Sequence, residues 1–281
     1  MHAAPGVSWF PGPLPRCSRS TGDPMLLPLL LTTALAATDV TLETADGTKV
    51  HALADTVKDA KKGVVLVHMA GRSAKDWSYL SEKLSRAGQS VVAPDLRGHG
   101  RNIPEGDDPD VPDEDWAKMV QEVQSSVQYL RDQGVQEVSC AGASIGANLC
   151  LLAAAADPQI VNLVLLSPGL NYKGVKTVAA IEAYGERPVL LVASEDDNFA
   201  FRSATVLETK ATGQRKYQIL QNAGHGTKML NRDPGLEGLM TSWLLGTYEL
   251  AAGELVAPRP RNAESIAEDV KTTGEKLQSH Q

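Results

Sequence analysis

A serine, several acidic residues and a histidine, which together could hydrolyse an acyl bond, follow one another in that order along the chain. Ser144 lies within Gly142-Ala143-Ser144-Ile145-Gly146, between an apolar run typical of a strand and a run of small and apolar residues typical of a helix. G-x-S-x-G in this context predicts a tight turn that exposes the serine hydroxyl. We predict that Ser144 is a nucleophile and that the Ile145 amide faces a developing oxyanion. The alternative is an ordinary glycine-flanked turn with an inert serine.

A nucleophilic serine needs a base that removes its proton and an acid that holds the base in one tautomer. His225 lies in a glycine-flanked loop after the last predicted strand and is the candidate base. The candidate acids are the consecutive residues Glu195, Asp196 and Asp197, which follow another predicted strand. All these residues fall at carboxyl ends of strands, the edge at which open α/β sheets place their sites.

Other residues that often carry chemistry show patterns that favour structural roles. His68 ends a predicted buried strand, where a structural histidine is expected. The chain has three cysteines and no C-x-x-C, and we expect Cys140 and Cys150 to be buried free thiols and no metal to be bound. The pair Gly98 and Gly100 lacks the third glycine of a dinucleotide fingerprint, so we expect no cofactor.

The elements that must position these residues alternate between strands and helices. Such alternation predicts an α/β fold with a mostly parallel central sheet of about eight strands, right-handed crossovers and helices on both faces. The first two strands form a predicted hairpin. The predicted strands are 40–44, 49–54, 63–68, 91–94, 138–141, 160–166, 189–193 and 217–220. The predicted helices are 74–87, 115–133, the stretch after Ser144, 175–183, 199–212, and 229–245 with a break near Pro234.

Length and charge narrow the classes of partner. A chain of 281 residues fits one large α/β domain or two small ones, and its 42% apolar content can form a sizeable core. The formal net charge of −7 argues against nucleic acid as a partner and indicates mainly solubility. We therefore expect a small-molecule substrate, and the sequence leaves the oligomeric state open.

Three segments are predicted along the chain: residues 1–37 as a leader, 38–250 as the α/β domain and 251–281 as a flexible tail. The apolar stretch Leu26–Ala36 is too short to span a bilayer and ends in small residues, which predicts a signal peptide with Met25 as the true start. The mature protein is then periplasmic or secreted and carries no membrane span. The alternative is a disordered leader on a cytoplasmic protein.

Several motifs together resemble the α/β-hydrolase superfamily over roughly residues 40–248. They are V-H-M-A-G-R at 67–72, D-L-R-G-H-G-R at 95–101, G-A-S-I-G at 142–146, S-E-D-D at 194–197 and A-G-H-G at 223–226. The resemblance implies that Asp197 is the acid, because it follows the small strand-end residue Ser194 by three positions. It also implies that Ala70 supplies a second oxyanion amide. Met69 replaces the glycine usual in the family, so Met69 stays a candidate as well.

The resemblance further implies a small serine esterase of the dienelactone-hydrolase type, with serine in place of cysteine. Such an enzyme cleaves carboxylic esters or thioesters through an acyl-enzyme. Many relatives insert a helical lid before the acid, and the elements predicted between Ser144 and Asp197 leave no room for one. We therefore expect small acyl groups and an open site bordered by loops 69–75, 104–113 and 168–175. A peptidase or acyltransferase using the same triad, or a non-catalytic ligand-binding homologue, remains an alternative.

Overall fold

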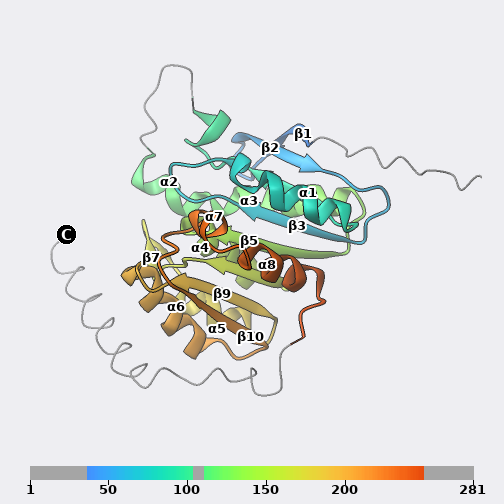
Figure 1. The fold of residues 1–281 in the computed structure, drawn as a ribbon. Coiled ribbons are helices and arrows are strands. Elements are labelled where there is room, and N and C mark those ends of the chain that lie inside the picture. The colour runs from blue at the N-terminus through green and yellow to red at the C-terminus, as the bar shows by residue number, and fades with distance from the viewer. Residues whose placement is uncertain (1–36, 104–110, 250–281) are drawn as a thin grey trace, which may run out of the picture. The chain divides into compact units, whose positions relative to one another are not determined.

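The computed structural model describes residues 37–103 and 111–249, and this part of the chain contains every predicted site residue (Figure 1). The predicted tail and nearly all of the predicted leader lie outside the described residues, as does most of the acidic loop 104–113. The three-segment division, the signal peptide and the start at Met25 therefore stay predictions.

The described chain is built on one eight-stranded sheet in the order β1-β2-β4-β3-β5-β6-β9-β10. The strands are β1 Thr38–Glu43, β2 Lys49–Asp55, β3 Lys62–Val67, β4 Ser90–Pro94, β5 Glu137–Ala143, β6 Ile160–Leu166, β9 Val189–Ser194 and β10 Arg215–Leu220. β2 is antiparallel to both β1 and β4, and every other neighbouring pair is parallel. The mostly parallel sheet of about eight strands and the first hairpin are confirmed.

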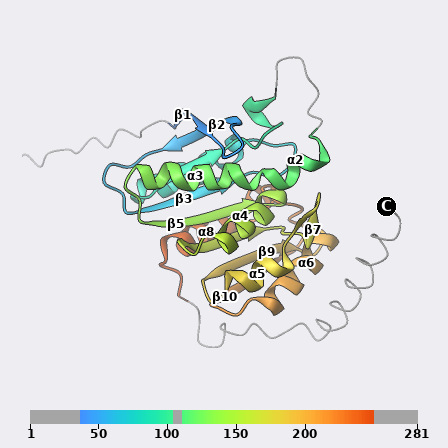
Figure 2. The same cartoon turned by 180° about the vertical axis from the view of Figure 1, so that it is seen from behind.

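Helices cover both faces of this sheet, as predicted. Successive residues of β3 point to opposite faces: Val65 and Val67 join one core cluster, while Val64 and Leu66 join the other. One face carries α2 Asp113–Lys118, α3 Val120–Asp132, α4 Ile145–Ala156, α5 Val178–Tyr184 and α6 Asn198–Lys210 (Figure 2). The other carries η1 Ala74–Trp77, α1 Ser78–Arg86, α7 Lys228–Arg232 and α8 Leu236–Leu245 (Figure 1). A short turn, η2 Gly100–Asn102, follows β4. Within the described ranges no helix has the length and apolar character needed to cross a membrane.

The loop after β6 differs from the prediction. The helix expected over 175–183 begins only at Val178, and the residues before it form a small antiparallel hairpin of β7 Asn171–Tyr172 and β8 Val175–Lys176. The two turn residues, Lys173 and Gly174, both have positive φ, at 51° and 81°. Two residues with positive φ form the tight turn that joins the strands of a hairpin. Val175 and Lys176 then pair with Tyr172 and Asn171 as a strand, so the helix begins after them.

The prediction of free thiols at Cys140 and Cys150 is wrong, because the two residues form a disulfide. Cys140 lies in β5 and Cys150 in α4, and both side chains are fully buried in the same core cluster. The strand, the turn at Ser144 and the helix fold back on one another, which brings the two Cα atoms to 5.7 Å. That separation lies within the usual range for a disulfide. The bond therefore ties together the two elements that flank Ser144.

Candidate active site

Ser144 occupies a tight turn between the end of β5 and the start of α4. Its backbone has φ 55° and ψ −121°, a conformation that costs energy in a residue with a side chain and is concentrated at functional sites. The flanking glycines are required by packing. A Cβ at Gly142 would overlap the backbone of Gly146, and a Cβ at Gly146 would overlap the carbonyl oxygens of Val67 and His68. The structure thus shows the local geometry that the G-x-S-x-G sequence predicts.

Asp197 and His225 are brought into direct contact from two separate loops. The Oδ2 atom of Asp197 lies 2.5 Å from Nδ1 of His225. Asp197 is also the N-cap of α6, because its Oδ1 atom accepts a hydrogen bond from the Ala200 amide at 3.4 Å. A helix N-terminus favours a negatively charged side chain. The two carboxylate oxygens therefore have separate partners, and Asp197 is held in the orientation that reaches the imidazole.

The neighbouring acid, Asp196, holds the histidine loop from the outside. It is exposed, and its Oδ1 atom accepts hydrogen bonds from the Ser194 hydroxyl and from the Gly224 amide, the latter at 3.2 Å. The Ser194 hydroxyl oxygen in turn accepts from the Ala223 amide at 2.9 Å. The hydrogen bond from Ser194 lowers the pKa of Asp196. Among the three consecutive acids, only Asp197 contacts His225, and Glu195 is an exposed loop residue.

Tyr172, in the hairpin that the sequence did not predict, contacts both Ser144 and His225. Its hydroxyl donates to the Ser167 carbonyl oxygen at 3.2 Å and lies close enough to the Ser144 side chain for that side chain to lower its pKa. Its ring meets the His225 ring nearly edge-on, with centroids 6.2 Å apart. Burial raises the pKa of Tyr172, and the nearby charge of Asp197 raises it further. The phenol therefore stays protonated at neutral pH, and through it Ser144 and His225 share one small region.

The predicted oxyanion residues lie on two adjoining segments. Ile145 is the first residue of α4, while Met69 and Ala70 directly follow β3. The carbonyls of Val67 and His68 press against Gly146 in the first turn of α4, so these two segments are in contact. The structure therefore brings the three predicted donors to one corner of the site. Their role as oxyanion donors stays a prediction.

The side chain of Met69, one of the predicted oxyanion residues, packs against the loop that carries His225. It is buried and lies under the histidine loop, where a Cβ at Gly226 would meet its sulfur at 2.5 Å. That loop is also fixed by two hydrogen bonds. The Gly226 amide donates to the Ser167 hydroxyl at 2.9 Å, and the Thr227 hydroxyl donates to Asp76 at 2.7 Å. Met69 thus supports the backbone next to His225.

His68 is structural, as expected. Its side chain is fully buried, and its Nε2 atom accepts a hydrogen bond from the Leu96 amide at 2.9 Å. Nδ1 must then carry the proton, which it donates to the Met69 carbonyl oxygen at 2.8 Å. Burial lowers the pKa of His68 to about 4. The neutral ring joins the loop after β3 to the loop after β4.

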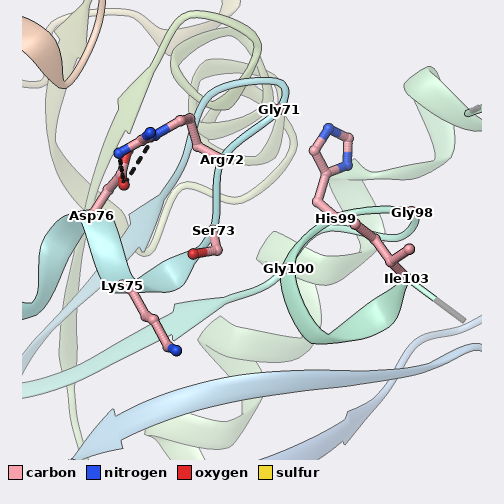
Figure 3. A pocket seen from close by; sticks show the side chains of 9 residues that line it. All are labelled: Gly71, Arg72, Ser73, Lys75, Asp76, Gly98, His99, Gly100 and Ile103. Atoms are coloured by element: carbon pink, nitrogen blue, oxygen red, sulfur yellow. Dashed lines mark hydrogen bonds and ion pairs between the residues drawn. The ribbon is translucent and has the colours of Figure 1, made fainter. Parts of the chain in front are cut away.

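A cavity of about 420 Å³ adjoins the loop after Ala70 (Figure 3). Arg72 and Asp76 form an ion pair on one wall, and His99 and Ile103 lie on the other. Ser144, Asp197 and His225 do not line it. Among the described residues, no three His, Cys, Asp or Glu side chains are grouped so that they could hold a metal ion.

Comparison with known proteins bears on the fold and on part of the sequence. The profile of the serine aminopeptidase S33 family matches residues 58–184, a little under half of the chain. That match includes Ser144 but neither Asp197 nor His225. The chain matches no curated protein in sequence.

Solved structures match over most of the described chain. An esterase of Pyrococcus furiosus superposes with a TM-score of 0.61 at 16% identity, covering 75% of this chain and 92% of the esterase. A dienelactone hydrolase of Anabaena variabilis gives a TM-score of 0.60 at 19% identity, covering 76% and 98%. A serine hydrolase of Cycloclasticus zankles gives 0.61 at 13% identity, covering 76% and 100%. This chain therefore has the α/β-hydrolase fold, and the resemblance to that superfamily is confirmed.

Proposed function

We propose that this protein is a serine hydrolase that cleaves carboxylic esters or thioesters of small acyl groups, with Ser144, His225 and Asp197 as its catalytic residues. The contact between Asp197 and His225 is the observation that carries the proposal. It lies at the same carboxyl edge of the sheet as the strained turn that presents Ser144. A base oriented by an acid, next to a serine on such a turn, is the arrangement that acyl transfer by serine needs.

In the proposed reaction, His225 removes the proton from Ser144 Oγ through Nε2 while that oxygen attacks the carbonyl carbon of the ester. Asp197 keeps the proton of the imidazole on Nδ1 and stabilises the imidazolium that forms. The C–O or C–S bond to the leaving group then breaks, and His225 gives its proton to the departing alcohol or thiol. The product of this half-reaction is an acyl group bonded to Ser144.

In the second half-reaction, His225 removes a proton from water, and the resulting oxygen attacks the acyl carbon. The carboxylic acid leaves and Ser144 recovers its proton. Both tetrahedral intermediates carry a negative oxygen, which the backbone amides of Ile145 and of Ala70 or Met69 would stabilise. Donors of this kind are typically worth about 10²–10³ in kcat each.

The preference for small acyl groups is supported by the short connection between β6 and β9. Residues 167–188 are all described, and they hold only the β7–β8 hairpin and α5. This connection contains no helical insertion that could supply an apolar surface for a long chain. Ligand sites bind apolar groups by burying them. The proposed site is thus suited to short acyl chains.

Steady-state hydrolysis of p-nitrophenyl butyrate tests the proposed function. We expect turnover by the wild type and a loss on the order of 10⁶ in kcat for Ser144→Ala, as for other serine triads. Absence of turnover by the wild type would favour a non-catalytic ligand-binding homologue. The match to an aminopeptidase profile favours a peptidase as the second candidate, and p-nitroanilides of single amino acids test it.

We also propose that the protein works outside the cytoplasm. The apolar stretch Leu26–Ala36 and the disulfide between Cys140 and Cys150 support this, because disulfides persist in oxidising compartments. N-terminal sequencing of protein from its native host should give a mature start near Ala37 or Thr38. Residues 26–36 still attached to a soluble cytosolic protein would contradict export.

A further inference from the structure

An exposed aromatic side chain stands next to the proposed catalytic acid. Phe199 follows Asp197 by two residues, in the first turn of α6, and is 48% exposed. Among the described residues, only Tyr79 and Ile219 are other large hydrophobic side chains with comparable exposure. The ring of Phe199 packs against that of Tyr172, with centroids 5.3 Å apart and an interplanar angle of 59°. The two rings form what we call the aromatic wall.

The β7–β8 hairpin holds Tyr172 in place through buried polar contacts. Asn148 of α4 is fully buried, and its amide donates to the Val175 carbonyl oxygen at 2.9 Å and accepts from the Gly169 amide at 3.0 Å. The Thr177 hydroxyl donates to the Gly169 carbonyl oxygen at 2.7 Å. A Cβ at Gly169 would lie 2.5 Å from the ring of Tyr172. The Tyr172 side of the aromatic wall is therefore preformed, and binding against that ring costs little ordering entropy.

The aromatic wall reaches from the solvent to the nucleophile. At its inner end the ring of Tyr172 lies nearly perpendicular to the ring of His225, and its hydroxyl lies beside the Ser144 side chain. At its outer end Phe199 is open to a ligand. A substrate whose carbonyl carbon sits on Ser144 Oγ would therefore place one of its two arms along these rings.

We infer that the aromatic wall binds an aromatic ring carried by the ester substrate, on either its acyl or its alcohol arm. This inference rests on the proposed function. Aromatic rings prefer offset or edge-to-face contact with other aromatic rings, and such contact stabilises a complex beyond the area that it buries. A saturated ring of the same size lacks this electrostatic match. Phe199 and Tyr172 are thus specificity residues for an aryl-bearing ester.

Two pairs of esters test the inference, and the two members of each pair differ only in whether one six-membered ring is aromatic or saturated. Benzyl acetate and cyclohexylmethyl acetate differ in the ring of the alcohol arm. Methyl phenylacetate and methyl cyclohexylacetate differ in the ring of the acyl arm. In one pair we expect kcat/KM for the aromatic ester to exceed that for the saturated ester by about three- to tenfold, the range typical of an aromatic pair. The pair that responds identifies the arm.

Phe199→Leu keeps an apolar side chain but removes the ring, so it should bring this ratio close to one. Tyr172→Phe keeps both rings and should preserve the ratio. Tyr79→Leu is the matched control, because Tyr79 is an exposed aromatic residue on α1, which packs at the other end of the sheet, and it should leave the ratio unchanged.

Ratios near one in both pairs for the wild type would overturn the inference, as would a ratio that Phe199→Leu leaves intact. Hydrolysis of ethyl acetate, which has no ring, tests the proposed function separately. Wild-type turnover of ethyl acetate that Ser144→Ala abolishes, together with ratios near one, would contradict the aromatic wall alone. Turnover that survives Ser144→Ala would contradict the proposed function itself.

Discussion

Asp197 Oδ2 and His225 Nδ1 lie 2.5 Å apart, although the two residues are separated by 28 positions in the chain. Each partner is held by its own surroundings. The second oxygen of Asp197 caps α6, and the loop of His225 is held by hydrogen bonds from the backbone amides of the residues before and after it, Gly224 and Gly226. Geometry fixed in this way before a substrate arrives is what orientation-dependent catalysis requires.

The two neighbouring aspartates should respond differently to the same change. Asp197→Asn should lower kcat by roughly 10⁴, because the amide favours the wrong tautomer of His225. Asp196→Asn should cost less than about tenfold, since its carbonyl oxygen can still accept from the Gly224 amide. Steady-state kinetics on p-nitrophenyl butyrate makes the comparison. If Asp196→Asn loses most of its kcat while Asp197→Asn keeps it, then Asp196 and not Asp197 is the acid.

The disulfide should stabilise the folded protein measurably. It closes a loop with a sequence separation of 10, for which chain entropy gives about 3 kcal/mol. We expect the free energy of unfolding in urea to fall by about that amount when the bond is reduced. Thiol titration of the unfolded full-length chain provides the control. Without reductant, the titration should find one free thiol, that of Cys17. With reductant, it should find three. Three free thiols in the untreated protein would contradict the disulfide.

Buried His68 should make stability depend on pH. Its pKa is about 4 in the folded protein and about 6.5 when unfolded, so the unfolded state binds more protons between these values. Stability therefore falls as the pH is lowered through this window, by about 2 kcal/mol between pH 8 and pH 5. His68→Gln should remove that part of the pH dependence, whatever its effect at pH 8. Urea titrations at the two pH values measure it, and an equal slope in both proteins would refute this contribution.

The proposed esterase activity should fall as the acyl chain of the substrate becomes longer. Because the connection from β6 to β9 contains no helical insertion, kcat/KM on p-nitrophenyl esters should fall from butyrate to dodecanoate. The measurement uses substrate concentrations below the point at which the long ester forms micelles. A higher value on dodecanoate than on butyrate would contradict the proposed preference.

Much of this architecture follows from local sequence patterns. Strands buried on both faces read as continuous apolar runs, as Val64–Val67 do, and their order with the helices fixes a mostly parallel sheet. The turn at Ser144 was predictable because only glycines fit beside it. The spacing of the three acids alone does not distinguish Asp197 from Asp196, and only the resemblance favours Asp197. Its contact with His225 depends on the cap of α6, which that spacing does not encode.

Other features depend on contacts between distant segments. Tyr172 is one aromatic residue in a polar loop, and its position against His225 depends on a hairpin that the buried Asn148 of another element holds in place. The sequence does not predict the disulfide, because two buried cysteines in apolar surroundings show the same pattern whether they are free or bonded. Only the packing of α4 on β5 brings their Cα atoms to 5.7 Å.

Covalent labelling with a fluorophosphonate, followed by peptide mapping, tests the central claim most directly. Such probes react with a serine only when a base activates it. The account predicts a single adduct on Ser144 in the wild type, none at any site in Ser144→Ala, and strongly slowed labelling in His225→Ala. An unlabelled wild type, or an adduct on a different serine, would contradict the assignment of Ser144 as the activated nucleophile.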